Sequence, residues 1–252
     1  MLEEAFAYGS SPVHRADPRV RLVYAVAYSF VVALSTEFAV LWAALAAGVA
    51  SCVLARMAVV PLARRMAAVN VFVLFLWAVV PLTAGGEALA TAGPFTVSRE
   101  GVRLCGLITL RTNAVALTCF AMLATMPVAR LGHAMHRLKA PAHLVHLLLM
   151  SHRYVFVLAR EYQQMRRAAA LRCFSPGANT HTYRTYAYLV GMLFVRATSR
   201  AQRVNKAMMC RGFSGTFHTL DELRFRGADA AWAIGFAAVL TVLALGGVLP
   251  VV

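Results

Sequence analysis

Two arginines stand at the predicted ends of long basic helices. One helix, over residues 161–173, is stopped by a Ser-Pro-Gly sequence, and the second, over residues 200–211, is stopped by a glycine. An arginine in the last turn complements the negative end of the helix dipole, and its guanidinium can also form a two-pronged contact with a partner carboxylate. Simple capping explains one such residue, but the repetition favours a docking role for Arg172 and Arg211.

Five histidines could bind a transition metal, because imidazole is a common metal ligand. His133 and His136 form one pair with i, i+3 spacing, His143 and His146 form another, and His152 follows. No carboxylate or thiolate lies at matching spacing on the same predicted helix, and such pairs are common by chance. We therefore predict that these side chains pack at an interface and that the chain holds no metal.

A further polar feature is Arg111 with Asn113, near the middle of the apolar stretch at residues 102–126. An arginine at the centre of a bilayer costs roughly 2.5–3.5 kcal/mol on insertion scales, so its side chain should face protein. Two interpretations stay open. The side chains contact another membrane subunit, or they form hydrogen bonds within the chain.

Catalytic motifs are missing from the sequence. It has no phosphate-binding loop of the Gly-x-x-x-x-Gly-Lys type, no His-Glu-x-x-His and no Gly-x-Ser-x-Gly. The ten acidic residues are mostly isolated, and the five cysteines form no Cys-x-x-Cys pair. These absences predict a protein that is not an enzyme and has no cofactor, so that any ATP hydrolysis would lie on another chain.

The composition is that of a membrane protein. The 252 residues are 60% hydrophobic and 14% charged, whereas soluble domains are about 45–50% apolar and about 25% charged. The net charge of +15 fits the excess of Lys and Arg on the cytoplasmic side of membrane proteins. The N-terminus lacks the basic start of a signal peptide, so we expect the first apolar stretch to remain.

About five transmembrane helices follow from the apolar stretches. Residues 22–54 are too long for one span of about 20 residues, so we divide them at the Ser-Thr-Glu sequence of residues 35–37. Further spans are predicted over residues 66–82, 102–126 and 228–249, and residues 83–101 are too rich in turn formers for a helix. The predicted organisation is a membrane region over 1–126, a cytoplasmic region over 127–227 and a last span within 228–252.

The cytoplasmic region carries 16 Lys and Arg between Pro127 and Gly227, against three acidic residues. Its apolar runs are short or interrupted by Arg and His, which is typical of amphipathic helices at the membrane interface. We predict an all-α polytopic membrane protein with such cytoplasmic helices. One additional hairpin of spans within residues 141–196 is the alternative.

Several stretches together resemble the transmembrane (T) component of energy-coupling-factor (ECF) transporters, within the cobalt/nickel subgroup (CbiQ- or NikQ-like). That family has two short Ala-Arg-Gly-type motifs at the ends of coupling helices, and residues 171–173 and 210–212 are similar to them. Residues 11–19 are similar to the N-terminal Asp-Pro-Arg segment of the subgroup, and residues 152–167 to its coupling helix. Residues 207–215 are close to its Ala-Met-x-x-Arg-Gly-Phe-x-Gly signature, the most specific element.

The resemblance implies a coupling scaffold in a bacterial cell (inner) membrane, crossing the lipid bilayer several times. Its expected partners are two cassette ATPase subunits and a membrane subunit that binds cobalt or nickel. Arg172, Arg211 and Gly212 would belong to the docking motifs for the ATPases.

Two other classes of function compete with this one. A membrane-embedded transferase with a basic phosphate-binding face is disfavoured, because few acidic residues are present to hold a metal or act as a base. A membrane-tethered nucleic-acid-binding module is disfavoured because the basic residues alternate with long apolar runs. We expect no nucleic-acid partner.

Overall fold

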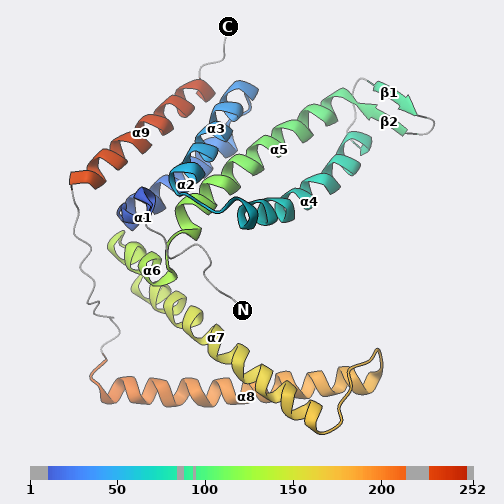
Figure 1. Cartoon of the computed structure of the whole chain (residues 1–252), viewed down its shortest axis with the longest axis vertical. Coiled ribbons are helices and arrows are strands. Elements are labelled where there is room, and N and C mark those ends of the chain that lie inside the picture. Colours follow the sequence, from blue (N-terminus) through green and yellow to red (C-terminus); the bar gives the residue numbers. More distant parts are fainter. Residues whose placement is uncertain (1–10, 84–87, 93–94, 214–226, 249–252) are drawn as a thin grey trace. The chain divides into compact units, whose positions relative to one another are not determined.

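A computed structural model describes residues 11–83, 88–92, 95–213 and 227–248. The chain is helical apart from one short antiparallel hairpin among the described residues (Figure 1). The elements are α1 (Pro12–Arg15), α2 (Pro18–Leu34), α3 (Phe38–Leu54), α4 (Val59–Thr83), β1 (Ala88–Ala92), β2 (Phe95–Ser98), α5 (Arg99–Cys119), the π-helix η1 (Phe120–Ala124), α6 (Val128–Arg137), α7 (Ala142–Leu171), α8 (Thr180–Cys210) and α9 (Gly227–Val248). The predicted all-α polytopic membrane fold is thereby confirmed.

Two compact units make up the described chain, and their boundary falls within α6. The first, which we call the membrane unit, consists of residues 11–134 and 227–248. The second consists of residues 135–213, and its two long helices, α7 and α8, are here called the basic helix pair. The sequence-based boundaries at residues 126/127 and 227/228 remain a prediction.

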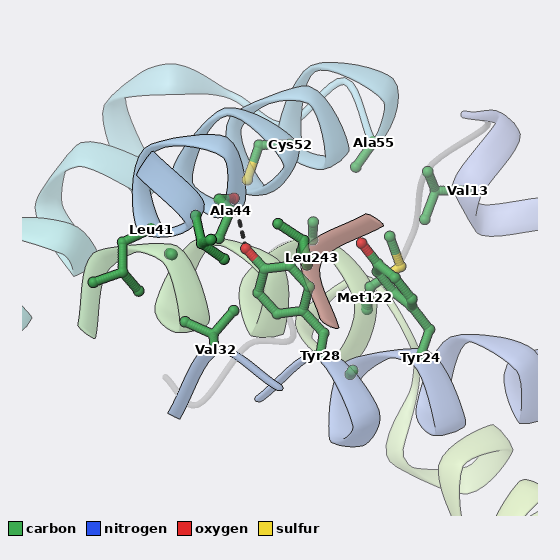
Figure 2. Close-up of a cluster of buried hydrophobic side chains, with 14 residues drawn as sticks. Val13, Tyr24, Tyr28, Val32, Leu41, Ala44, Cys52, Ala55, Met122 and Leu243 are labelled. Carbon is green, nitrogen blue, oxygen red and sulfur yellow. Dashed lines mark hydrogen bonds between the residues drawn. The ribbon is translucent and has the colours of Figure 1, made fainter. Parts of the chain in front are cut away.

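The predicted break at residues 35–37 is confirmed, because α2 ends at Leu34 and α3 begins at Phe38. Both helices have 17 residues, which corresponds to about 26 Å at 1.5 Å per residue. Between them, the Tyr28 hydroxyl donates to the Ala44 carbonyl at 2.6 Å, as Figure 2 shows. The hairpin is therefore fixed by a buried hydrogen bond as well as by its short turn.

Small residues allow α3 to lie close against α5. The buried residues of the seam are Ala44, Gly48 and Cys52 on α3, and Ala114, Thr118 and Ala121 on α5 and η1. A Cβ atom on Gly48 would meet the Ala114 carbonyl oxygen at 3.2 Å. Because apolar burial drives helices together only weakly inside lipid, close backbone approach of this kind is a main source of stability for membrane helices.

Helix α4 begins earlier than the sequence predicts. The sequence predicts this span only from residue 66, but Pro61, Arg64 and Arg65 lie in the first turns of α4. A proline is tolerated there because the first N–H groups of a helix have no intrahelical partner. Likewise α5 begins at Arg99, where the Ser98 hydroxyl accepts the Gly101 N–H at 3.1 Å.

The segment before α5 contains a hairpin that the sequence did not predict. Strands β1 and β2 pair antiparallel, with Ala92 opposite Phe95 at the end near the turn. The described residues 88–92 and 95–98 are non-helical, as the sequence predicts, whereas Thr83 and residues 99–101 are helical. The strand pairing was missed because the turn formers obscure it.

Four described helices are long and apolar enough to cross a bilayer, namely α4, α5 with η1, α7 and α9. The expected spans at α2 and α3 fall just short of this length. The apolar runs of residues 127–227 are expected to be too short or too interrupted by Arg and His to span, but α7 is one continuous helix of 30 residues that is long and apolar enough to cross a bilayer. Its polar residues do not end the helix, since Arg, His and Gln are compatible with helical backbone.

Candidate functional site

Helix α7 ends in a left-handed cap that contains one of the two predicted docking arginines. Arg172 is the C-terminal cap residue, and Cys173 follows with φ of 62°. The Cys173 N–H donates to the Ala170 carbonyl at 3.0 Å, and the Phe174 N–H donates to the Ala169 carbonyl at 3.1 Å. This pair of hydrogen bonds is a Schellman motif.

Helix α8 ends in the same way. Arg211 is the cap residue, and Gly212 follows with φ of 73°. The Gly212 N–H donates to the Met209 carbonyl at 3.0 Å, and the Phe213 N–H donates to the Met208 carbonyl at 3.1 Å. The two helix ends therefore share an arginine cap, a left-handed residue and a phenylalanine, in that order.

Both guanidinium groups are open to solvent. Arg172 and Arg211 are exposed, and neither guanidinium forms a hydrogen bond or an ion pair with another residue that the structure describes. No acidic residue other than Glu161 occurs in the sequence from Pro127 to Leu220. In the described part of the basic helix pair, Glu161 is the one acidic residue, and its carboxylate is paired with Arg196 and Arg200.

The two caps lie at opposite ends of the basic helix pair. Figure 1 shows α7 and α8 crossing one another, and ring contacts join the end of each helix to the start of the other. Helix α8 alone has 31 residues, which corresponds to about 46 Å. Arg172 and Arg211 consequently form two separate sites with a similar local geometry.

One acidic residue links the two helices near their crossing. The Glu161 carboxylate on α7 contacts Arg200 at 2.9 Å and Arg196 at 3.5 Å, both on α8. The Glu161 side chain is 11% exposed, and the two arginines are 38–50% exposed. These ion pairs hold α7 and α8 in register. Their contribution to stability is modest, because the two arginines remain well solvated.

Arg111 and Asn113 both find partners inside the membrane unit. Arg111 donates to the Ser35 carbonyl at 2.7 Å, at the turn between α2 and α3. Asn113 and Asn70 on α4 exchange two hydrogen bonds, each of 3.0 Å. These contacts match the interpretation of internal hydrogen bonds, although the buried Arg111 Nε has no hydrogen-bond partner among the described residues.

The histidines do not come together. His133 and His136 lie on α6, and His143, His146 and His152 lie on α7. Among the residues that the structure describes, no three His, Cys, Asp or Glu side chains could share a metal ion. Two of the rings make aromatic contacts instead, His146 with Phe213 at 5.6 Å between centroids and His152 with Phe156 at 5.1 Å.

Sequence reasoning missed the residues that shape the caps. It ended the first helix at the Ser-Pro-Gly sequence of residues 175–177, whereas the helix already ends at Leu171 through the left-handed Cys173. It also gave no role to Phe174 and Phe213. The available signal was an apolar residue two positions after each arginine, which is common in Schellman motifs.

Comparison with known proteins places these features in a wider context. The family profile described as "CbiQ: Cobalt transport protein" matches residues 9–220. A protein of Brevibacillus brevis named energy-coupling factor transporter transmembrane protein EcfT is 25% identical over 246 residues, covering 93% of this chain and 92% of that protein.

Two further relatives match over shorter stretches. The cobalt transport protein CbiQ of Rhodobacter capsulatus is 27% identical over 149 residues, covering 57% of this chain and 61% of that protein. An uncharacterised protein of Methanocaldococcus jannaschii is 30% identical over 128 residues, covering 50% of this chain and 47% of that protein. These two alignments span less than two thirds of the relatives' own length.

Proposed function

Because the chain belongs to the CbiQ family of cobalt transport proteins, we propose that it is the energy-coupling membrane subunit of an ECF-type ABC importer for cobalt or nickel. In this role it links two cytoplasmic ATPase subunits to a membrane subunit that binds the metal. The chain itself is not catalytic, and ATP hydrolysis takes place on the partner subunits.

The observation that carries this proposal is the repeated arginine cap. Arg172 and Arg211 have the same position in two Schellman motifs and are both exposed. Ordinary capping does not require an arginine here, because the hydrogen bonds of the cap are made by the backbone. Two similar sites at opposite ends of a helix pair suit a partner that is present in two copies.

The charge of the basic helix pair supports acidic docking sites on those partners. An arginine that forms a two-pronged contact with a carboxylate loses part of its hydration when the complex assembles. Removing one member of such a desolvated pair typically costs about 2–5 kcal/mol, whereas a solvated arginine at the rim costs well under ~1 kcal/mol. The loss of binding energy on mutation to alanine therefore distinguishes an arginine that docks on a carboxylate from one that stays solvated.

The test is association with the ATPase subunits, measured for Arg172→Ala, Arg211→Ala and the double variant. Each single variant should weaken association or uncouple hydrolysis from metal uptake, and insertion into the membrane should be normal. Arg166→Ala and Arg203→Ala are matched controls, because both residues are exposed arginines on the same two helices. The controls should associate as the parent does.

Arg172→Lys and Arg211→Lys should restore only part of the association, since lysine cannot reproduce the two-pronged contact. Parent-level association and uptake in the double alanine variant would refute the docking role. Both residues would then be simple helix caps.

We further propose that the basic helix pair and its caps face the cytoplasm, with the β1–β2 hairpin on the opposite side. The asymmetry of Lys and Arg supports this orientation. In a background without other cysteines, a membrane-impermeant thiol reagent should reach Arg99→Cys in intact cells. It should reach native Cys173, which is exposed, only after permeabilisation. Labelling of Cys173 in intact cells would overturn the orientation.

The same reagent tests whether α7 crosses the membrane. His143→Cys lies near the start of α7 and Cys173 lies just after its end. If α7 is cytoplasmic, as we propose, both positions should be labelled only after permeabilisation. If it spans the bilayer, one position should react in intact cells.

The metal ion is bound, in this proposal, by the partner membrane subunit. Replacing His133, His136 and His143 together with Asn should leave metal uptake within a few-fold of the parent. Complete loss of uptake with an assembled complex would instead assign the chain a place in the path of the metal.

A further inference from the structure

The two arginine caps differ in how they are held against the rest of the basic helix pair. After Arg172 the chain turns directly into α8, so the end of α7 is tethered by a short loop. After Arg211 the next described element is α9, which belongs to the membrane unit. Among the described residues, a contact between side chains joins the end of α8 to the start of α7.

The loop at the α7 end is reinforced by hydrogen bonds. The Asn179 side chain accepts the Thr182 N–H at 2.8 Å, and the Thr182 hydroxyl accepts the Gly177 N–H at 3.1 Å. Thr182 is buried, with 5% of its surface exposed. The Phe174 ring adds contacts with His181 and Tyr186, but it supplements a turn that is already fixed.

At the α8 end, the Phe213 ring packs on His146, which lies on the second turn of α7. The ring centroids are 5.6 Å apart, within the range of about 4.5–7 Å typical of attractive aromatic pairs. Phe213 is only partly exposed, although Arg211 and Gly212 beside it are exposed. The contact joins residues that are far apart in the sequence and lies two residues from the arginine.

We propose that Phe213, packed on His146, is a positioning residue that holds the Arg211 cap in the orientation required for docking. This inference rests on the docking role proposed above for Arg211. It also gives His146 a defined role, as the aromatic surface on which the cap rests. Phe174 has the same place in the first motif but a smaller role, because the loop already holds Arg172.

The first measurement reports geometry and does not depend on the ATPases. Spin labels at Leu144→Cys and Lys206→Cys, both exposed positions, are introduced into the full chain with its native cysteines replaced by alanine. In lipid nanodiscs, Phe213→Ala should broaden the distribution of distances between the labels. Phe213→Tyr should restore the narrow distribution, and Phe174→Ala should leave it unchanged.

The second measurement is association with the ATPase subunits. Phe213→Ala and His146→Ala should each weaken association about two- to tenfold, as expected for loss of one aromatic pair. The double variant should be no weaker than either single variant, because both changes remove the same contact. His146→Phe should retain association, since it preserves the aromatic surface.

Several outcomes would overturn the inference. Unchanged distances in Phe213→Ala would show that the ring does not hold the helix end, even if association falls. Broadened distances with parent-level association would show that docking does not need this positioning. The Arg211→Ala variant tests the proposed function separately. If that variant loses association while Phe213→Ala does not behave as expected, the docking role of Arg211 stands and the positioning role of Phe213 fails.

Discussion

The membrane unit and the basic helix pair are stabilised in different ways. In the membrane unit, buried side chains from α1, α2, α3, α5, η1 and α9 form one hydrophobic cluster (Figure 2). In the basic helix pair, α7 buries Val145 and Met165 and α8 buries Thr182, although the helices have 30 and 31 residues. Two crossing helices touch over a short length and cannot cover their own apolar faces.

The difference shows which part of the molecule depends on other surfaces. The described part of the basic helix pair exposes large apolar side chains, among them Leu147, Tyr188 and Phe194. Between α7 and α8 lies a mainly apolar cavity of about 390 Å³, lined by residues that include Tyr154 and Leu158. The membrane unit thus has a packed core of its own, whereas the described part of the basic helix pair leaves most of its apolar side chains uncovered.

The largest effect should come from disturbing the packing of the membrane unit. Gly48→Leu would drive a side chain into α5, where a Cβ alone would meet three atoms at 3.2–3.3 Å. We expect destabilisation of about 3 kcal/mol, seen as a lower thermal midpoint of the purified protein. Gly235→Leu on α9 and Gly191→Leu on α8 are matched controls, because nothing lies within 4 Å of either added Cβ. If the two controls lowered the thermal midpoint equally, the close packing of α3 on α5 would not explain the effect.

A smaller effect is expected from the polar anchor of the α2–α3 turn. Arg111→Leu removes the hydrogen bond to the Ser35 carbonyl, and hydrogen bonds from charged groups contribute about 1.5–3 kcal/mol. Thermal unfolding in detergent should show a loss of about 2 kcal/mol, and Arg103→Leu, at an exposed position of the same helix, should show almost none. If Arg111→Leu abolishes assembly without a loss of stability, the arginine contacts a partner subunit instead.

Within the basic helix pair, Glu161→Gln should have an effect of about 1 kcal/mol or less. The change removes the ion pairs with Arg196 and Arg200, which are partly solvated and screened. Hydrogen exchange of the backbone amides near the crossing should become faster, while amides in the membrane unit should be unaffected. If Glu161→Gln lowered the free energy of unfolding as much as Gly48→Leu, the basic helix pair would have a stabilising core.

The smallest effect concerns the two caps and distinguishes them directly. Cys173 has φ of 62°, a conformation that costs an ordinary residue about 1–2 kcal/mol. Cys173→Gly should therefore stabilise the end of α7 by about 0.5–1 kcal/mol, and Gly212→Ala should destabilise the end of α8 by about 1 kcal/mol. Local hydrogen exchange at the last turn of each helix measures both changes. Destabilisation by Cys173→Gly or stabilisation by Gly212→Ala would disprove the shared left-handed cap.

Patterns of hydropathy and charge determined much of the fold. A run of apolar residues interrupted at residues 35–37 was enough to predict the α2–α3 hairpin, because a helix must match the thickness of the bilayer. The positions of Arg172, Arg211 and Gly212 could also be predicted, since glycine and arginine mark helix ends through local backbone energies. Helix ends of this kind are decided by the residues within one turn.

Contacts between distant residues were decided only by the tertiary structure. The pairing of Asn70 with Asn113, the contact of Arg111 with Ser35 and the packing of Phe213 on His146 each join separate elements. One sequence shows which side chains need partners, but the identity of each partner depends on how the helices pack in three dimensions.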